Sequence, residues 1–178
     1  MKLESPVLIR IPLLLSVLLL SCLLDGCGYR VGSLVHPQIK TVAIADVKNE
    51  SYEVLASAIM RKILAERFQF DNSLKLTSLE KADCIVYVRI TNVYNRSVSW
   101  RNTNRVEDYR ANEYTLQVSA EYTVLRPGVA LPMVPKSSAN GVSTYLFAHD
   151  PAIGREGALK QCLLQIADRI VSSTVEAW

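Results

Sequence analysis

Cys27 is the residue of this chain that is best placed to undergo chemistry, because it follows a long apolar run and a small residue. The surrounding stretch reads LLDGCGYRV over residues 23–31, and Ile11–Leu24 ahead of it is almost entirely aliphatic. At about 14 residues the run is shorter than the roughly 20 that a membrane-spanning helix needs. A basic start, an apolar run and a small residue are typical of an export signal that is removed. We therefore expect cleavage at this point, with Cys27 as the new N-terminus.

Leu24, Asp25 and Gly26 ahead of Cys27 resemble the lipobox of bacterial lipoproteins. In such proteins the cysteine becomes the first residue and is acylated on its sulfur and its amine. The resemblance implies an N-acyl diacylglycerol lipid on Cys27 and no other cofactor. Two or three acyl chains hold a protein on a membrane far more firmly than one chain does.

Two alternatives to this acylation site stay open. Cys22, preceded by Leu19, Leu20 and Ser21, also fits the pattern, and the apolar run could instead remain as an uncleaved anchor. Gly28 follows Cys27, where an aspartate would be the usual signal for retention in the inner membrane. The sequence therefore favours the outer membrane of a bacterium with two membranes, with the protein lipid-anchored on the periplasmic side.

Other residue patterns that perform chemistry are missing from the sequence. His36 and His149 are solitary, and the sequence contains no HExxH or CxxC ligand motif and no GxSxG, GxGxxG or P-loop motif. Asp46, Asp83 and Glu121 are better explained as strand-end or surface charges than as catalytic carboxylates. We expect neither an enzyme nor a metal site.

Length and charge narrow the class of protein further. A chain of 178 residues is sufficient for one domain with a substantial core. Removal of residues 1–26 takes away Lys2 and Arg10 together with Glu4 and Asp25, so the formal charge remains +3. A balance this mild is far from that of a nucleic-acid-binding protein.

Two cysteines, Cys84 and Cys162, remain besides Cys27 after the leader is removed. Export permits a disulfide between them, but only if their α-carbons lie within about 6 Å of each other. Both residues lie in apolar stretches, which favours two buried free thiols over a bridge.

Residues 27–38 contain glycines and a proline with little periodicity, and we interpret them as a lipidated tether ahead of one domain over 39–178. A buried strand is predicted over Lys40–Val47. An amphipathic helix follows over 51–68, with Asn49 or Ser51 as its N-cap. The stretch Ala82–Ile90 alternates and is predicted to be a strand with Cys84, Val86, Val88 and Ile90 on its buried face.

The second half of the domain shows the same kinds of pattern. Tyr114–Leu125 alternates strictly between apolar and polar residues, and the later stretch NGVSTYLFA reads as a further strand. A final helix is predicted with Asp150 as its cap and Pro151 in its first turn, and it carries a stripe of Leu159, Leu163, Ile166 and Ile170. Its two glycines suggest that its regular part begins only near Ala158. Consecutive strands between two helices predict an α+β, two-layer sandwich, with both helices on one face of a mixed, mostly antiparallel sheet of about four strands.

The stretch Asn95–Arg110 is predicted to be a projecting hairpin rich in basic and aromatic side chains. Arginine binds phosphate oxygens in pairs, and flat rings can lie against sugars or guanidinium groups. The stretch is either a solvated loop or a surface that contacts a phosphorylated glycolipid or a protein partner. Arg96, Arg101 and Arg105, together with Lys136 in a second predicted loop, are the candidate phosphate-binding residues.

Several stretches in this order and spacing resemble the LptE family of outer-membrane lipoproteins, which act in lipopolysaccharide assembly. They are Cys27-Gly28-Tyr29, IKTVAIADVKNESYE, LEKADCIVYVRITNV and REGALKQCLLQIADRIV. The resemblance spans nearly all of the chain after the leader. It implies two helices on a four-stranded sheet and a protein that sits as a plug inside the β-barrel LptD, helps that barrel to fold and assists lipopolysaccharide transport to the cell surface. The implied partners are that barrel, lipopolysaccharide and the membrane, with no nucleic acid.

The opening TVAIADVKNES also resembles lipoproteins of the LpoB type, which stimulate peptidoglycan synthases. Those proteins carry a long disordered tether that reaches across the periplasm. Residues 28–38 extend to only about 40 Å at about 3.5 Å each. A tether of this length favours a domain held close to the membrane.

Overall fold

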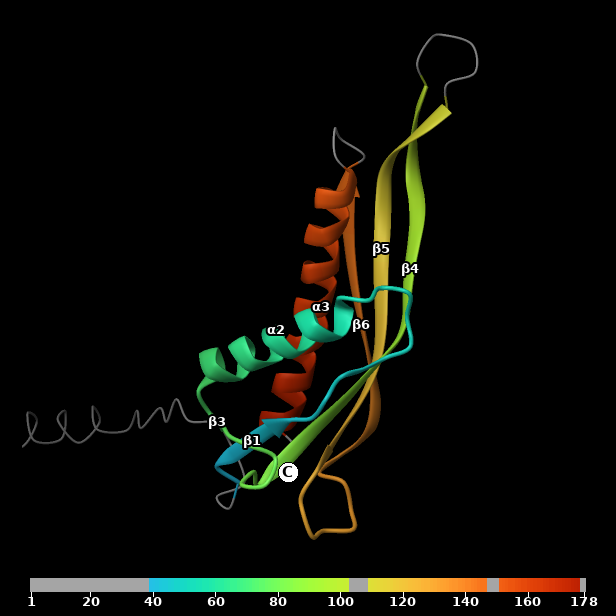
Figure 1. Ribbon diagram of the computed structural model, residues 1–178. Coiled ribbons are helices and arrows are strands. Elements are labelled where there is room, and N and C mark those ends of the chain that lie inside the picture. Colours follow the sequence, from blue (N-terminus) through green and yellow to red (C-terminus); the bar gives the residue numbers. More distant parts are fainter. Residues whose placement is uncertain (1–38, 103–108, 147–150, 177–178) are drawn as a thin grey trace, which may run out of the picture. The chain divides into compact units, whose positions relative to one another are not determined.

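The structure, a computed structural model, describes residues 39–102, 109–146 and 151–176, which form a mixed sheet with two helices on one face (Figure 1). The elements in chain order are β1 (Thr41–Ile44), β2 (Lys48–Asn49), α2 (Ala56–Asp71), β3 (Lys75–Leu76), β4 (Cys84–Asn102), β5 (Tyr109–Leu125), β6 (Val134–Leu146) and α3 (Pro151–Val175).

The sheet has the strand order β3-β1-β4-β5-β6, and the short β2 pairs with β4 beyond the end of β1. The pairs of β1 with β3 and β4 are parallel, whereas β4, β5 and β6 are antiparallel neighbours. The predicted two-layer α+β class is confirmed. The described sheet has six strands where about four were expected, because β2 and β3 each contribute two residues.

β4 and β5 are longer than their alternation predicts. Val86, Val88 and Ile90 of β4 are buried as expected. A bulge between Ile90 and Asn92 then shifts the alternation by one residue, so that Val93 is the next buried side chain. Pairing continues to Asn102 opposite Tyr109, so the predicted hairpin is a continuation of these two strands. Its tip, residues 103–108, lies outside the described residues.

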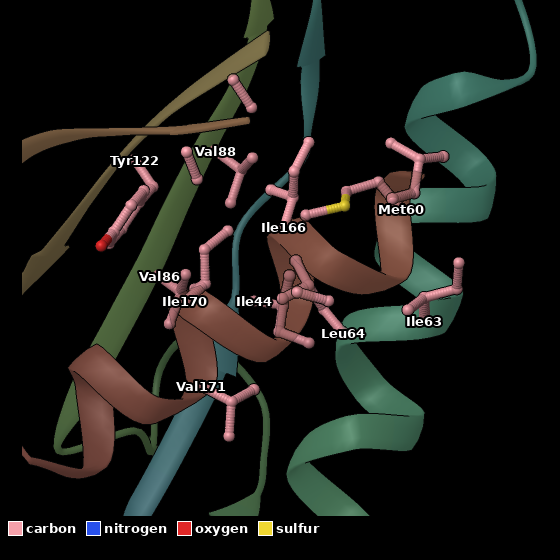
Figure 2. Close-up of a cluster of buried hydrophobic side chains, with 14 of the residues drawn as sticks. Ile44, Met60, Ile63, Leu64, Val86, Val88, Tyr122, Ile166, Ile170 and Val171 are labelled. Carbon is pink, nitrogen blue, oxygen red and sulfur yellow. The ribbon is translucent and has the colours of Figure 1, made fainter. Parts of the chain in front are cut away.

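The core lies between the sheet and the helices (Figure 2). Ile166 and Ile170 of α3, Val86 of β4 and Leu64 of α2 belong to this one buried cluster. The predicted stripe of α3 is confirmed, because Leu159, Leu163, Ile166 and Ile170 are all buried. Burial of a leucine or isoleucine side chain contributes about 1.5–3 kcal/mol, so this stripe fixes α3 on the sheet.

The predicted start of the first helix is wrong. α2 begins at Ala56 rather than near residue 51, and neither Asn49 nor Ser51 caps it. The Asn49 amide instead donates to the carbonyl oxygen of Glu53 at 2.7 Å, and its Oδ1 accepts from the backbone and hydroxyl of Ser51. Glu53 forms an ion pair with Arg155 of α3. These contacts hold residues 49–53 in a turn that is joined to α3, so α2 begins only after this turn, at Ala56.

The second helix, α3, begins at Pro151, as the first-turn proline predicts, but the expectation that its regular part begins near Ala158 is wrong, because the helix includes both of its glycines. The predicted cap, Asp150, lies outside the described residues. The middle of α3 covers the free edge of β6. The amide of Gln165 accepts from the N–H of Val142 at 2.9 Å and donates to the carbonyl of Val142 at 3.0 Å. This double hydrogen bond satisfies backbone groups of an edge strand that would otherwise be open to another strand.

Cys84 and Cys162 are both free and buried, as the sequence favoured. The Cys84 thiol lies 3.6 Å from the carbonyl oxygen of Thr41, and the Cys162 thiol lies 3.3 Å from that of Leu116. Burial raises the pKa of each thiol to about 11. The two thiols are therefore protonated at neutral pH and act as core side chains.

Asp83 holds the start of β1 against the start of β4. Its Oδ2 accepts from the backbone N–H groups of Lys40 and Thr41, each at 2.9 Å, and from the Thr41 hydroxyl at 2.8 Å. The hydrogen bond from the backbone of Lys40, followed by that from the Thr41 hydroxyl, lowers the pKa of this carboxyl below 3.8. Asp83 is thus a strand-end charge, as its sequence position suggests.

Asp83→Asn is expected to lower the free energy of unfolding at pH 7 by about 1.5–3 kcal/mol, because a neutral amide oxygen replaces the charged acceptor of three hydrogen bonds. The lowered pKa means that Asp83 stabilises the fold fully above its unfolded pKa, and that this contribution disappears as pH falls through the lower folded pKa. Urea unfolding should show the gap between the two proteins narrowing below about pH 4. Asp46→Asn is the matched control, because the Asp46 side chain is 94% exposed and should matter little at any pH. A gap that does not change with pH would contradict this role.

Candidate functional site

The structure separates Arg96 and Lys136, two of the four residues predicted to bind phosphate. Arg96 is exposed on β4, and Arg101 lies on the same strand, opposite Arg110 of β5. Arg105 and the acylation candidate Cys27 lie outside the described residues. Lys136 was expected in a loop, which is wrong: it lies on β6, because that strand begins at Val134, ahead of Pro135.

Arg96 and Lys136 lie on the face of the sheet that α2 and α3 leave open, which we call the uncovered face. Arg96 pairs across the ladder with Thr115 of β5, and Lys136 contacts Glu121 of the same strand. Six residues of β5 separate these points, which is about 20 Å at about 3.3 Å per residue. The two cations therefore cannot bind the same phosphate group.

A network of charges surrounds Glu121 on the uncovered face. Its carboxylate forms ion pairs with Arg89 and, at 3.0 Å, with the Lys136 ammonium. Arg89 also reaches the Glu50 carboxylate at 3.3 Å. The hydrogen bonds from Arg89 and then Lys136 lower the pKa of Glu121. The same pairing raises the pKa of Arg89. Lys136 is thus already paired with a carboxylate where it lies.

Arg89, Glu121 and Lys136 line part of a depression of about 260 Å³ on the uncovered face. Tyr87 contributes its ring to the lining, beside Lys48 and Thr123. By contrast, Arg96 has no ion-pair partner within the part of the chain that the structure describes. Arg96 is therefore the predicted site residue on this face that is most available to an anion.

Large apolar side chains on the uncovered face are a feature that sequence reasoning missed. Tyr87, Tyr94, Val142 and Leu146 are 41%, 55%, 47% and 61% exposed. Each lies at an outward position of its strand, where a solvated sheet normally carries polar residues. The alternation over Ala82–Ile90 could have revealed Tyr87, which lies on the outward side of that strand, whereas Tyr94 follows the bulge after Ile90 and could not be placed in this way. Apolar side chains mixed with paired charges are typical of a surface that binds another macromolecule.

Neither a metal-binding cluster nor a membrane-spanning helix is present in the described part of the chain. The side chains of residues 39–98, 113–146 and 152–176 include no cluster of histidine, cysteine or carboxylate groups that could hold a metal ion. None of the helices described is both long and apolar enough to cross a membrane.

Comparisons with known proteins agree with this architecture. A hypothetical protein of Chlamydia trachomatis superposes with a TM-score of 0.50 at 12% identity, covering 78% of this chain and 97% of its own. A protein of Xanthomonas campestris gives a TM-score of 0.50 at 9% identity, covering 79% of this chain and 89% of its own. At such low identity the likeness establishes the fold alone. No curated protein sequence matches the chain significantly.

The sequence itself identifies the family. Residues 39–174 match the family model described as LptE, lipopolysaccharide-assembly. The match covers the sheet and both helices almost completely, from the residue before Lys40 to the last turn of α3. This chain therefore belongs to the LptE family of lipopolysaccharide-assembly proteins.

Proposed function

We propose that this protein is an outer-membrane lipoprotein that plugs an LptD-like β-barrel, helps that barrel to assemble and assists the transport of lipopolysaccharide to the cell surface. The observation that carries this proposal is the family match over residues 39–174. In this function the protein works by binding and shape, without catalysis and without a cofactor other than its own lipid.

The lipid on Cys27 would place the domain. Residues 1–26 serve as the export signal, residues 27–38 as the tether, and residues 39–178 as the domain. The tether reaches at most about 40 Å. A domain restricted to this distance from the membrane on the periplasmic side is suitably placed to meet a barrel in the same membrane.

The uncovered face would form the contact with the barrel. Its exposed apolar residues, Tyr87, Tyr94, Val142 and Leu146, are suited to packing against a protein wall. The Arg89–Glu121–Lys136 network keeps its charges paired, so that less solvation is lost when the face is covered. A face with both properties supports a plug.

Arg96, Arg101, Arg105 and Lys136 would contact the phosphates of lipid A or of the inner core. Guanidinium groups suit phosphate oxygens because they donate two parallel hydrogen bonds. The distance between Arg96 and Lys136 requires separate phosphate groups for these two residues. Lys136 must also leave Glu121, so we expect it to contribute less than Arg96.

Arg96→Gln is expected to weaken binding of purified lipopolysaccharide to the immobilised protein by about three- to tenfold, since one cation–phosphate contact contributes about 0.7–1.4 kcal/mol. Arg61→Gln is the matched control, because Arg61 is an exposed arginine of α2 that pairs with Asp46 at 2.8 Å. It should leave binding unchanged. Equal losses in both proteins would show that only total charge matters and would contradict a role for Arg96.

Depletion of the protein from its cell tests the proposed function as a whole. We expect newly made lipopolysaccharide to accumulate on the inner side of the envelope, because the barrel is not completed. The amount of correctly assembled LptD-like barrel should fall in parallel, as measured by its resistance to unfolding in detergent. Normal surface lipopolysaccharide and normal barrel levels after depletion would reject the proposal.

A further inference from the structure

Exposed apolar side chains gather at one level of the domain on two opposite sides of the sandwich. We call them the apolar band: Tyr94, Val142 and Leu146 on the uncovered face, and Val54, Leu55 and Ile153 in the helix layer. Those of the helix layer are 84%, 67% and 71% exposed. They cannot face the sheet, because side chains that do so are buried. Exposed apolar side chains that gather in this way indicate a binding surface.

Strand register places the uncovered-face members of the band close together. Tyr94 and Val142 are both opposite Gln117 of β5, so they lie in one row across three strands. Leu146 lies four residues farther along β6, which is about 13 Å at about 3.3 Å per residue. This side of the band is therefore about 13 Å tall.

The first turns of α3 lie at the same level as the end of β6. A Cβ added to Gly154 would lie 3.3 Å from the ring of Tyr145 and 3.4 Å from the carbonyl oxygen of Leu146. Ile153 precedes this glycine directly. Ile153 in the helix layer and Leu146 on the uncovered face are therefore at one height along the strands.

Arg155 of α3 holds the chain ahead of α2 at this level. It forms an ion pair with Glu53, and its guanidinium carbon lies 5.6 Å from the centre of the Tyr52 ring. To reach these partners, the chain between β2 and α2 crosses from β4 towards α3 (Figure 1). Val54 and Leu55 follow Glu53 directly, so they are held beside the start of α3. Because Glu53 and Arg155 are paired, less solvation is lost when this side of the band is covered.

We propose that the apolar band is the level at which the inner wall of a hollow protein partner closes around the domain. The inference rests on the proposed function, in which that partner is an LptD-like barrel. The occupant must surround the domain because the band has members on both sides of the sandwich. A flat partner, such as a membrane surface or a second copy of the chain, covers one side at a time. The contact goes beyond the uncovered face, because it adds the starts of both helices.

Cysteine labelling of the purified complex tests this contact. Leu146→Cys reports on the uncovered face, and Val54→Cys and Ile153→Cys report on the helix layer. Each full-length protein is tagged, purified with its partner in detergent and treated with a water-soluble maleimide, and the total label is measured after denaturation. The unsubstituted protein supplies the background, to which the buried Cys84 and Cys162 should add little.

Phe70→Cys is the matched control from outside the band. Phe70 is 81% exposed, close to the 84% of Val54, and lies near the opposite end of α2. Its ring contacts Arg67, which pairs with Asp168 of α3. Asp168 is fourteen residues along α3 from Gly154, which is about 21 Å at about 1.5 Å per residue.

We expect labelling at positions 54, 146 and 153 to be slower than at position 70 by about tenfold or more, because a protein interface excludes the reagent together with water. Protection at position 146 alone, with positions 54 and 153 as reactive as position 70, would show a partner on one side only and overturn the proposal. Equal protection at all four positions would show that burial is not confined to the band, which also overturns it.

Mass spectrometry of the same complex separates this contact from the proposed function. A complex that contains an outer-membrane barrel but protects only one side of the domain would reject closure at the band and leave the proposed function intact. A complex without any outer-membrane barrel would reject the proposed function, and with it the occupant of the band.

Discussion

Gly141→Ala is expected to lower the free energy of unfolding by about 3 kcal/mol or more, because β6 and α3 touch through this glycine. A Cβ at residue 141 would overlap the carbonyl oxygen of Cys162 and lie 2.7 Å from its carbonyl carbon. Both obstacles are backbone atoms in the middle of a helix, so no side-chain rotation relieves them. Relief requires α3 to move away from β6, which also breaks the double hydrogen bond between Gln165 and Val142.

Gly157→Ala is the matched control for this substitution. Gly157 lies within α3, and a Cβ added there meets nothing within 4 Å. Alanine in a helix interior is more favourable than glycine by about 0.5–1 kcal/mol, so this change should stabilise the protein. Urea unfolding at neutral pH measures both proteins. If both substitutions changed the free energy of unfolding in the same direction, the close approach of β6 and α3 would be contradicted.

Phe68→Ala is expected to cost about 3–5 kcal/mol, the range for removing a fully buried aromatic side chain. Phe68 is 0% exposed and belongs to the core formed by α2, α3 and the sheet. Its carbonyl oxygen also accepts the C-terminal hydrogen bond of α2, from the N–H of Asn72 at 3.1 Å. The last turn of α2 is therefore held both by the buried ring of Phe68 and by this backbone hydrogen bond. A large loss of stability should therefore be accompanied by loss of helical signal in circular dichroism.

Phe70→Ala provides the comparison from the same helix. Phe70 is 81% exposed, and its ring lies 5.3 Å from the guanidinium carbon of Arg67. An exposed contact of this kind contributes about 0.5–1 kcal/mol, so the effect should be several times smaller than at Phe68. Similar losses at the two phenylalanines would mean that α2 does not pack in this orientation.

The layers of the fold could be predicted from the sequence because they follow from periodicity. The alternation in β4 and β5 and the stripe on α3 predicted which side chains are buried, and burial of apolar surface decides the packing of such elements. The start of α2 could not be predicted in this way. The ion pair between Glu53 and Arg155 joins residues far apart in the chain, and it competes with a helix start that local capping preferences favour.

The candidate site could be predicted only in part, for a similar reason. The sequence indicated Arg96 and Lys136 as cations outside the core, and both are exposed. It could not show that Lys136 is paired with Glu121, because that contact requires β5 and β6 to be in register. Nor could it show that Tyr94 and Leu146 share one face, since that depends on the bulge after Ile90 and on the pairing of three strands.

Affinity purification of the tagged full-length protein from detergent-solubilised membranes tests the central claim most directly. The claim is that this chain plugs a large outer-membrane barrel and is anchored in the same membrane by its lipid. We predict that an LptD-like barrel is recovered in an amount comparable to the tagged protein, and that it stays bound through extensive washing. Recovery of a peptidoglycan synthase without any outer-membrane barrel would contradict the account.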